Sequence, residues 1–234
     1  MQDFPTEKVL ELAFAAYRIN GGYVKQTQRF SEGQPTVWSN KELVTYSAYY
    51  YNQKDTESDI KMWIPEDFLA LKVTDEDRAA KDRADLHMRR YTMLALGKLS
   101  DFENDIFTAY SSEQIPVNRI GLIAYIPQFV DRELEEKTYK ARLKADFADS
   151  KPINLHTVED TTVEILKKIP LREYETNLYF GGIGNDLVCF TKKDIHSVGD
   201  VFEIRARVRN HDQERETRTP MTRLNYVKLK KVEQ

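Results

Sequence analysis

Apolar residues recur every three to four positions through most of the first 150 residues, which is the spacing of one face of an α-helix. Ser39 with Glu42 and Ser100 with Glu103 are each a serine followed three residues later by a glutamate, a pairing typical of helix N-termini. Pro127 lacks an N–H, so we expect it to break or kink any helix that reaches it. The pattern predicts helices over residues 6–20, 39–53, 75–99, 100–112 and 129–146.

The period changes in the last 84 residues, where apolar and polar positions alternate and turn residues recur about every ten positions. Five short strands without a long helix between them are typical of a small barrel or sandwich. The predicted strands cover residues 161–169, 177–182, 187–192, 201–209 and 222–232. We therefore predict an α+β protein in which residues 1–150 are a helical region and residues 151–234 are a five-stranded OB-like β-barrel.

The composition is that of an ordinary globular protein, with 41% hydrophobic residues and a formal net charge of −3. No apolar run approaches the roughly 18 residues that a membrane span needs. The N-terminus lacks a basic start followed by an apolar stretch, so we expect no secretory signal and a cytoplasmic protein. Cys189 is the single cysteine, which excludes an internal disulfide and a structural zinc site built on cysteine pairs.

The net charge hides an uneven distribution along the chain. Residues 1–150 carry a balance of −5, whereas residues 201–234 hold nine basic against five acidic residues. In the predicted strand over 201–209, alternation places Arg205, Arg207 and Arg209 on one face, about 6–7 Å apart. That spacing is close to the separation of phosphates along a nucleic-acid strand. The last predicted strand adds three further cations, Arg223, Lys228 and Lys230.

Two tyrosines accompany these cations, Tyr179 and Tyr226. A basic groove with aromatic rings is typical of proteins that bind single-stranded nucleic acid, because bases stack on the rings while cations follow the backbone. An ordinary half-exposed strand also carries polar residues on its outer face, so alternation alone leaves both interpretations open. The predicted nucleic-acid-binding residues are Arg205, Arg207, Arg209, Arg223, Lys228, Lys230, Tyr179 and Tyr226.

The C-terminal segment also carries a series of motifs in a fixed order: Gly184-Asn185, Gly199-Asp200, Ala206-x-Val208-x-x-His211 and Thr222-x-Leu224-Asn225-x-Val227-Lys228. In this order, over about 55 residues, they resemble a small OB-fold module of phage and plasmid replication proteins. The segment departs from that module at Tyr226, where a basic residue is expected. The resemblance implies a phage-encoded, non-enzymatic protein that binds single-stranded nucleic acid during DNA replication or transcription in the host cytoplasm.

Two other functions remain open from the sequence. Tyr46, Tyr49, Tyr50 and Tyr51, with Trp38 nearby, could form a surface by which the helical region docks a replication or transcription enzyme. Asp59 and Lys61 have the acid-x-lysine spacing of Mg²⁺-dependent nucleases. The four histidines are scattered, and none lies at metal-ligand spacing from another. We therefore predict no catalytic residues, no metal and no cofactor.

Overall fold

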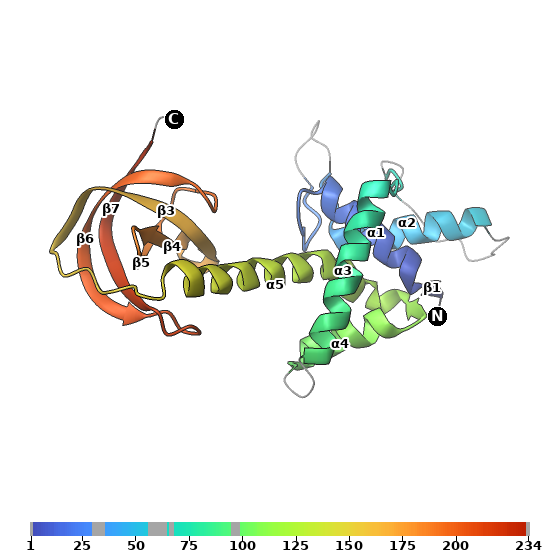
Figure 1. Ribbon diagram of the computed structural model, residues 1–234. Coiled ribbons are helices and arrows are strands. Elements are labelled where there is room, and N and C mark those ends of the chain that lie inside the picture. Colours follow the sequence, from blue (N-terminus) through green and yellow to red (C-terminus); the bar gives the residue numbers. More distant parts are fainter. Residues whose placement is uncertain (1, 30–35, 56–64, 66–67, 95–98, 233–234) are drawn as a thin grey trace. The chain divides into compact units, whose positions relative to one another are not determined.

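The computed structural model describes residues 2–29, 36–55, 65, 68–94 and 99–232. The chain divides into two compact units, Met1–Leu134 and Glu135–Gln234 (Figure 1). Each unit has its own hydrophobic core.

The first unit is helical. Its two short strands pair antiparallel with each other. The four helices predicted between residues 6 and 112 are confirmed, although the predicted end of the third, at residues 95–98, lies outside the described residues. In chain order its elements are β1 (Asp3–Pro5), α1 (Thr6–Ile19), α2 (Asn40–Asp55), α3 (Asp75–Leu94), α4 (Asp101–Ser111), β2 (Gln114–Pro116), the 3-10 turn η1 (Val117–Arg119) and the start of α5 (Ile120–Asp146).

Helix α1 lies against both α2 and α3 at the centre of this unit. Arg18 at the end of α1 binds Asp77 of α3 through two hydrogen bonds, from Nε at 2.8 Å and from Nη2 at 3.0 Å. Burial alone would raise the pKa of Asp77. The hydrogen bonds from Arg18 and from the Thr74 backbone and hydroxyl outweigh burial and hold that pKa below its usual value. The N-terminus of α4 shows the predicted capping box between Ser100 and Glu103.

Helix α5 corrects one prediction, because it continues through Pro127 and begins nine residues before the expected start. Proline removes one backbone hydrogen bond from a helix interior. Ile123, Ala124 and Ile126 around this position are fully buried in the core of the first unit. Their burial offsets the lost hydrogen bond, so packing rather than local propensity decides the helix here.

The second unit is a closed barrel, and its five strands confirm the predicted α+β class with a C-terminal five-stranded barrel. The pairing order is β3-β4-β5-β7-β6, and β6 pairs with β3 to close the barrel. All neighbouring strands are antiparallel except β5 and β7. The elements are β3 (Thr157–Leu171), the 3-10 turn η2 (Arg172–Tyr174), β4 (Thr176–Ile183), β5 (Asp186–Lys192), β6 (Val201–Gln213) and β7 (Pro220–Lys231).

The end of α5 packs on the outside of this barrel. Tyr139, Leu143 and Phe147 are buried there against outward-facing side chains of three strands, namely Leu166 of β3, Leu187 and Cys189 of β5, and Met221 of β7. The compact units consequently divide at residues 134 and 135, inside α5, whereas the sequence placed the boundary at residue 150. The difference arises because the apolar residues at positions 139, 143 and 147 belong to the core of the barrel unit.

Gly182 in β4 lets the helix approach the strand closely, and this gives a first prediction. A Cβ atom at this position would lie 2.5 Å from Cζ of Phe147, closer than side chains pack. We expect Gly182→Ala to lower the free energy of unfolding by about 1–3 kcal/mol through overpacking. Chemical denaturation would measure the loss. Gly182→Ala should cause a smaller loss in free energy of unfolding when it is combined with Phe147→Leu. Equal stability of the wild type and Gly182→Ala would contradict the close contact.

Candidate functional site

Strand β6 shows the alternation that the sequence predicted. Phe202, Ile204 and Ala206 point into the barrel and are buried, whereas Arg205 and Arg207 lie exposed on the outer surface. Arg209 is also exposed, but it lies at an irregularity in the β6–β7 pairing between Val208 and Asn210. The arginine row therefore faces solvent within the barrel unit.

Strand β7 does not alternate strictly, and the reason is a β-bulge. Arg205 pairs with Lys228 and Arg207 pairs with Asn225, so two residues of β6 span three of β7. The extra residue leaves both Asn225 and Tyr226 exposed. In a regular strand, residues 223 and 228 would point to opposite faces. The extra residue of the bulge reverses this alternation, so Arg223 and Lys228 are both exposed.

Tyr226 occupies this bulge with its side chain in solvent. Its relative exposure is 78%, and its backbone has a φ of +54°, in the left-handed region that L-residues rarely adopt. The guanidinium carbon of Arg207 lies 5.7 Å from the centre of the tyrosine ring, within range of a cation–π contact. The bulge thus presents an aromatic ring beside a cation on the outer face of the barrel.

Half of the predicted cations are held by carboxylates. Arg205 Nε lies 3.3 Å from Glu159, Lys230 Nζ lies 3.5 Å from Glu203, and Arg223 Nη2 lies 2.9 Å from Asp212. These pairs are largely exposed to solvent, so each contributes little to stability. They do lower the positive charge that this surface can offer to an anion.

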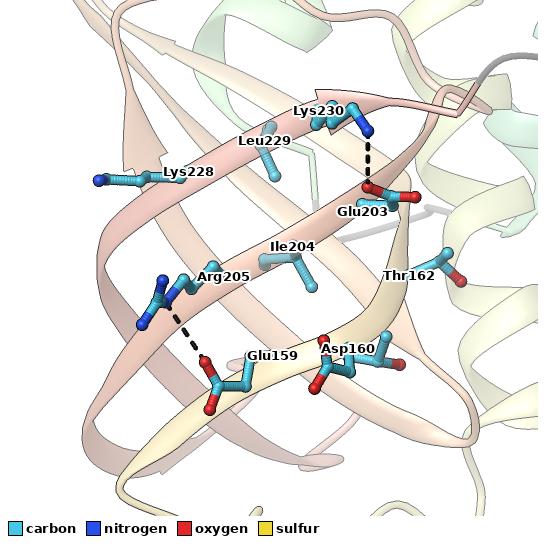
Figure 2. Close-up of a pocket in the computed structure, with 10 residues that line it drawn as sticks. Glu159, Asp160, Thr162, Glu203, Ile204, Arg205, Lys228, Leu229 and Lys230 are labelled. Atoms are coloured by element: carbon cyan, nitrogen blue, oxygen red, sulfur yellow. Dashed lines mark ion pairs between the residues drawn. The ribbon is translucent and has the colours of Figure 1, made fainter.

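The other cations lack such partners. Within the described ranges, Arg207, Arg209 and Lys228 form no ion pair with a carboxylate. Figure 2 shows Lys228 pointing away from both Glu159 and Glu203. We use the term β6–β7 face for the exposed surface formed by Arg205, Arg207, Arg209, Arg223, Tyr226, Lys228 and Lys230.

A hollow lies beside these cations, at the junction of β3, β6 and β7. A second bulge supplies its acidic side: Val158 pairs with Ala206 and Thr161 with Ile204, and Asp160 between them has a φ of +57°. The charged side chains that line the hollow are Glu159, Asp160, Glu203, Arg205, Lys228 and Lys230 (Figure 2). The acids among them are not among the site residues predicted from the sequence. The polar Glu159-Asp160 pair, which interrupts an alternating strand between Val158 and Val163, is the signal that could have indicated this bulge.

Tyr179 is not available for stacking, which corrects its predicted role. Its side chain is fully buried in the barrel core and stacks on Phe190 at a centroid distance of 5.6 Å. Its hydroxyl donates to the carbonyl of Asp194 at 2.7 Å and accepts from the N–H of His196 at 3.0 Å. Alternation places residue 179 inside the barrel, so this tyrosine anchors the loop between β5 and β6 instead.

The outer surface of β4 and β5 is also closed to ligands by the end of α5. In OB-type barrels this surface commonly binds oligonucleotides. Here Tyr139 packs on Phe180 of β4 at 5.8 Å, and Leu143 and Phe147 belong to the same buried cluster as Cys189 of β5. Burial raises the pKa of the Cys189 thiol to about 11, which disfavours the nucleophilic thiolate. The β6–β7 face is therefore the basic surface that the barrel leaves open.

The aromatic residues of α2 contribute to the core of the first unit. Tyr49 is buried against Phe4 at a centroid distance of 5.0 Å. Tyr46 packs edge-on against Trp38 and Phe68, at 5.8 and 5.3 Å. Tyr49 therefore belongs to the core, whereas Tyr46, Tyr50 and Tyr51 are half-buried, and the predicted docking surface stays a prediction. Asp59 and Lys61, the predicted nuclease pair, lie outside the described residues.

Two features are absent from the described part of the chain. It contains no group of three or more histidine, cysteine, aspartate or glutamate side chains placed to hold a metal ion. It also contains no helix that is long and apolar enough to span a lipid bilayer. Comparison of the chain with protein-family models, curated proteins and solved structures finds no match.

Proposed function

We propose that this protein binds single-stranded nucleic acid, without catalysing a reaction, on the β6–β7 face of its barrel. One observation carries the proposal. An aromatic ring, Tyr226, lies exposed in a bulge beside Arg207, on the surface where Arg209 and Lys228 also lack carboxylate partners. Soluble proteins usually bury large rings at least in part, so an exposed ring beside unpaired cations is consistent with a ligand surface.

The arrangement fits a single strand better than a duplex. A base can stack on the tyrosine ring only if it is not stacked and paired within a duplex. The free cations Arg207, Arg209 and Lys228 lie on the two strands around that ring, where they can approach the phosphates on either side of a stacked base. A duplex would offer its phosphates to the cations but would leave Tyr226 without a partner.

The charge pattern limits the affinity. Arg205, Lys230 and Arg223 are already bound to carboxylates, so about three cations remain for phosphates. For single strands the logarithm of the affinity falls with the logarithm of salt concentration at about −0.7 per phosphate contact, which gives a slope of about −2 here. Binding is consequently modest, and it suits a protein that acts together with partners. We propose a phage-encoded role in DNA replication or transcription, in line with the resemblance of residues 179–232 to replication modules.

A titration at several salt concentrations tests the proposal. Fluorescence anisotropy of a labelled oligo-dT should show binding whose affinity falls about 20-fold when salt rises from about 50 to about 200 mM, as three phosphate contacts require. A duplex of the same length should bind more weakly at each concentration. Absence of binding at the lowest salt, or an affinity that does not respond to salt, would exclude the proposed function.

A further inference from the structure

One edge of β7 lacks a strand partner over most of its length. On one side β7 pairs with β6 from Pro220 to Lys231. On the other side it pairs with β5 at three positions only, from Met221 to Arg223. Within the described strands, residues 224–231 therefore have no neighbour on the side away from β6. The end of β5, Phe190–Lys192, pairs with β4 and likewise has no partner on the side of β7.

The unpaired edge carries backbone groups that need hydrogen-bond partners. An edge strand presents a row of N–H and C=O groups that can pair with another chain. None of the backbone hydrogen bonds that loops of the described chain make reaches residues 224–231. The barrel is thus closed by three residue pairs near the start of β7 and is open along the rest of that strand. An extended segment could add to this edge as a further strand.

The charges along the edge indicate what such a segment must carry. Lys228, Lys230 and Lys231 are exposed on the unpaired part of β7, and Lys192 and Lys193 stand at the end of β5. Asp194 holds Lys192 at 2.7 Å and Glu203 holds Lys230 at 3.5 Å, which leaves the others without a carboxylate within the described chain. Lysines on an edge oppose pairing between two copies of the same strand, because like charges would face each other. They attract a strand with acidic side chains.

We infer that the edge of β7 at residues 224–231 binds an extended acidic segment of a partner polypeptide by β-strand addition. Backbone hydrogen bonds supply the affinity, and the lysines select carboxylates over cations. This site uses the backbone edge of β7, whereas the proposed nucleic-acid function uses side chains of the β6–β7 face. The two sites share Lys228 and Lys230, but they can fail independently, since strand addition does not require Tyr226 or the arginine row, and base stacking does not require the backbone edge.

A peptide with alternating glutamate and valine, four repeats long and labelled with fluorescein, is a suitable probe for the full-length protein. In an extended strand, every second residue directs its backbone N–H group to the same edge. Methylating the nitrogens of all glutamates therefore blocks one edge of the peptide, and methylating those of all valines blocks the other. We expect the unmethylated peptide to bind, one methylated isomer to lose at least about tenfold in affinity, and the other to bind as before.

Two further measurements accompany this comparison. Backbone amides of residues 224–231 should exchange hydrogen for deuterium more slowly when the unmethylated peptide is present. A peptide of lysine and valine should bind at least about tenfold more weakly, and the exposed double change Lys228→Glu with Lys231→Glu should reverse that preference. The double change Lys144→Glu with Lys151→Glu, which reverses two exposed lysines elsewhere in the barrel unit, is the matched control and should alter neither affinity by more than about twofold.

The inference is overturned by any other pattern. Equal binding of both methylated isomers would mean that only side-chain charge attracts the peptide. Loss of binding by both isomers would mean that the peptide does not pair through a single edge. Absence of binding by the glutamate peptide, or slowed exchange outside residues 224–231 only, would likewise reject strand addition at β7.

Discussion

Replacing Leu143 with alanine is expected to lower the free energy of unfolding of residues 135–234 by about 2–5 kcal/mol, the usual cost of removing a fully buried leucine side chain. Leu143 is completely buried between α5 and the outside of the barrel. The alanine would leave a cavity beside Leu166, Leu187 and Met221, which lie on three different strands and cannot all move together. Hydrogen exchange of barrel peptides at increasing denaturant concentrations would measure this loss.

The chain offers matched controls for this experiment. Leu134, on the same helix, is 45% exposed, and Leu134→Ala should change stability by no more than about 0.5 kcal/mol. Both tryptophans, Trp38 and Trp63, lie within residues 1–134, so their fluorescence follows the unfolding of that unit separately. A barrel that tolerated Leu143→Ala as well as Leu134→Ala would show that the helix does not belong to the barrel core.

Tyr226→Gly is expected to weaken binding of a single strand without weakening the fold. Loss of a stacked base costs about 1–3 kcal/mol, which corresponds to a rise in Kd of about 5- to 150-fold. Glycine adopts the left-handed conformation without steric cost, so the strain that tyrosine bears at a φ of +54° disappears. The free energy of unfolding should stay the same or rise by up to about 1 kcal/mol. The rise is limited because glycine also increases the conformational entropy of the unfolded chain, which offsets part of the relieved strain.

Two other substitutions at residue 226 separate the ring from the backbone. Tyr226→Phe keeps the stacking surface and should bind oligo-dT within about twofold of wild type. Tyr226→Ala removes the ring but keeps a Cβ in the left-handed region, so it should bind as weakly as the glycine variant and be less stable than it. Anisotropy and chemical denaturation measure the two quantities on the same samples. Full affinity in the glycine variant would show that the ring does not stack on a base.

The strands of the barrel could be predicted because their apolar residues alternate. Phe202, Ile204 and Ala206 mark the inner face of β6, and every predicted strand is present. The same rule could not place Tyr179, because its neighbours Leu178 and Phe180 are also apolar and lie on the other side of β4, against α5. A single strand does not reveal which of its faces turns inward when both faces are apolar, and β4 has two apolar faces because α5 covers its outer one.

The bulges and the covering helix could not be predicted from periodicity. A bulge depends on which residues face each other across two strands, and this pairing is not a property of either strand alone. Tyr226 is exposed because β7 has one residue more than β6 at that point, and Glu159 meets Arg205 through the corresponding bulge in β3. The acids beside the arginine row therefore became visible only in the folded barrel. Helix α5 similarly continues through Pro127 because tertiary packing compensates for the proline.

The central claim is that the β6–β7 face binds nucleic acid, and a comparison of two triple variants tests it most directly. One variant replaces Arg205, Arg207 and Arg209 with alanine. The other replaces three exposed cations elsewhere in the barrel unit, Lys144, Lys151 and Arg215, with alanine, and so changes the net charge equally.

In an oligo-dT titration at about 50 mM salt, the arginine variant should raise Kd by more than about tenfold, because two of the three phosphate contacts are lost. The control should stay within about threefold of wild type, since only the long-range field changes. Equal losses in both variants would contradict the claim, because binding would then depend on overall charge and not on this face.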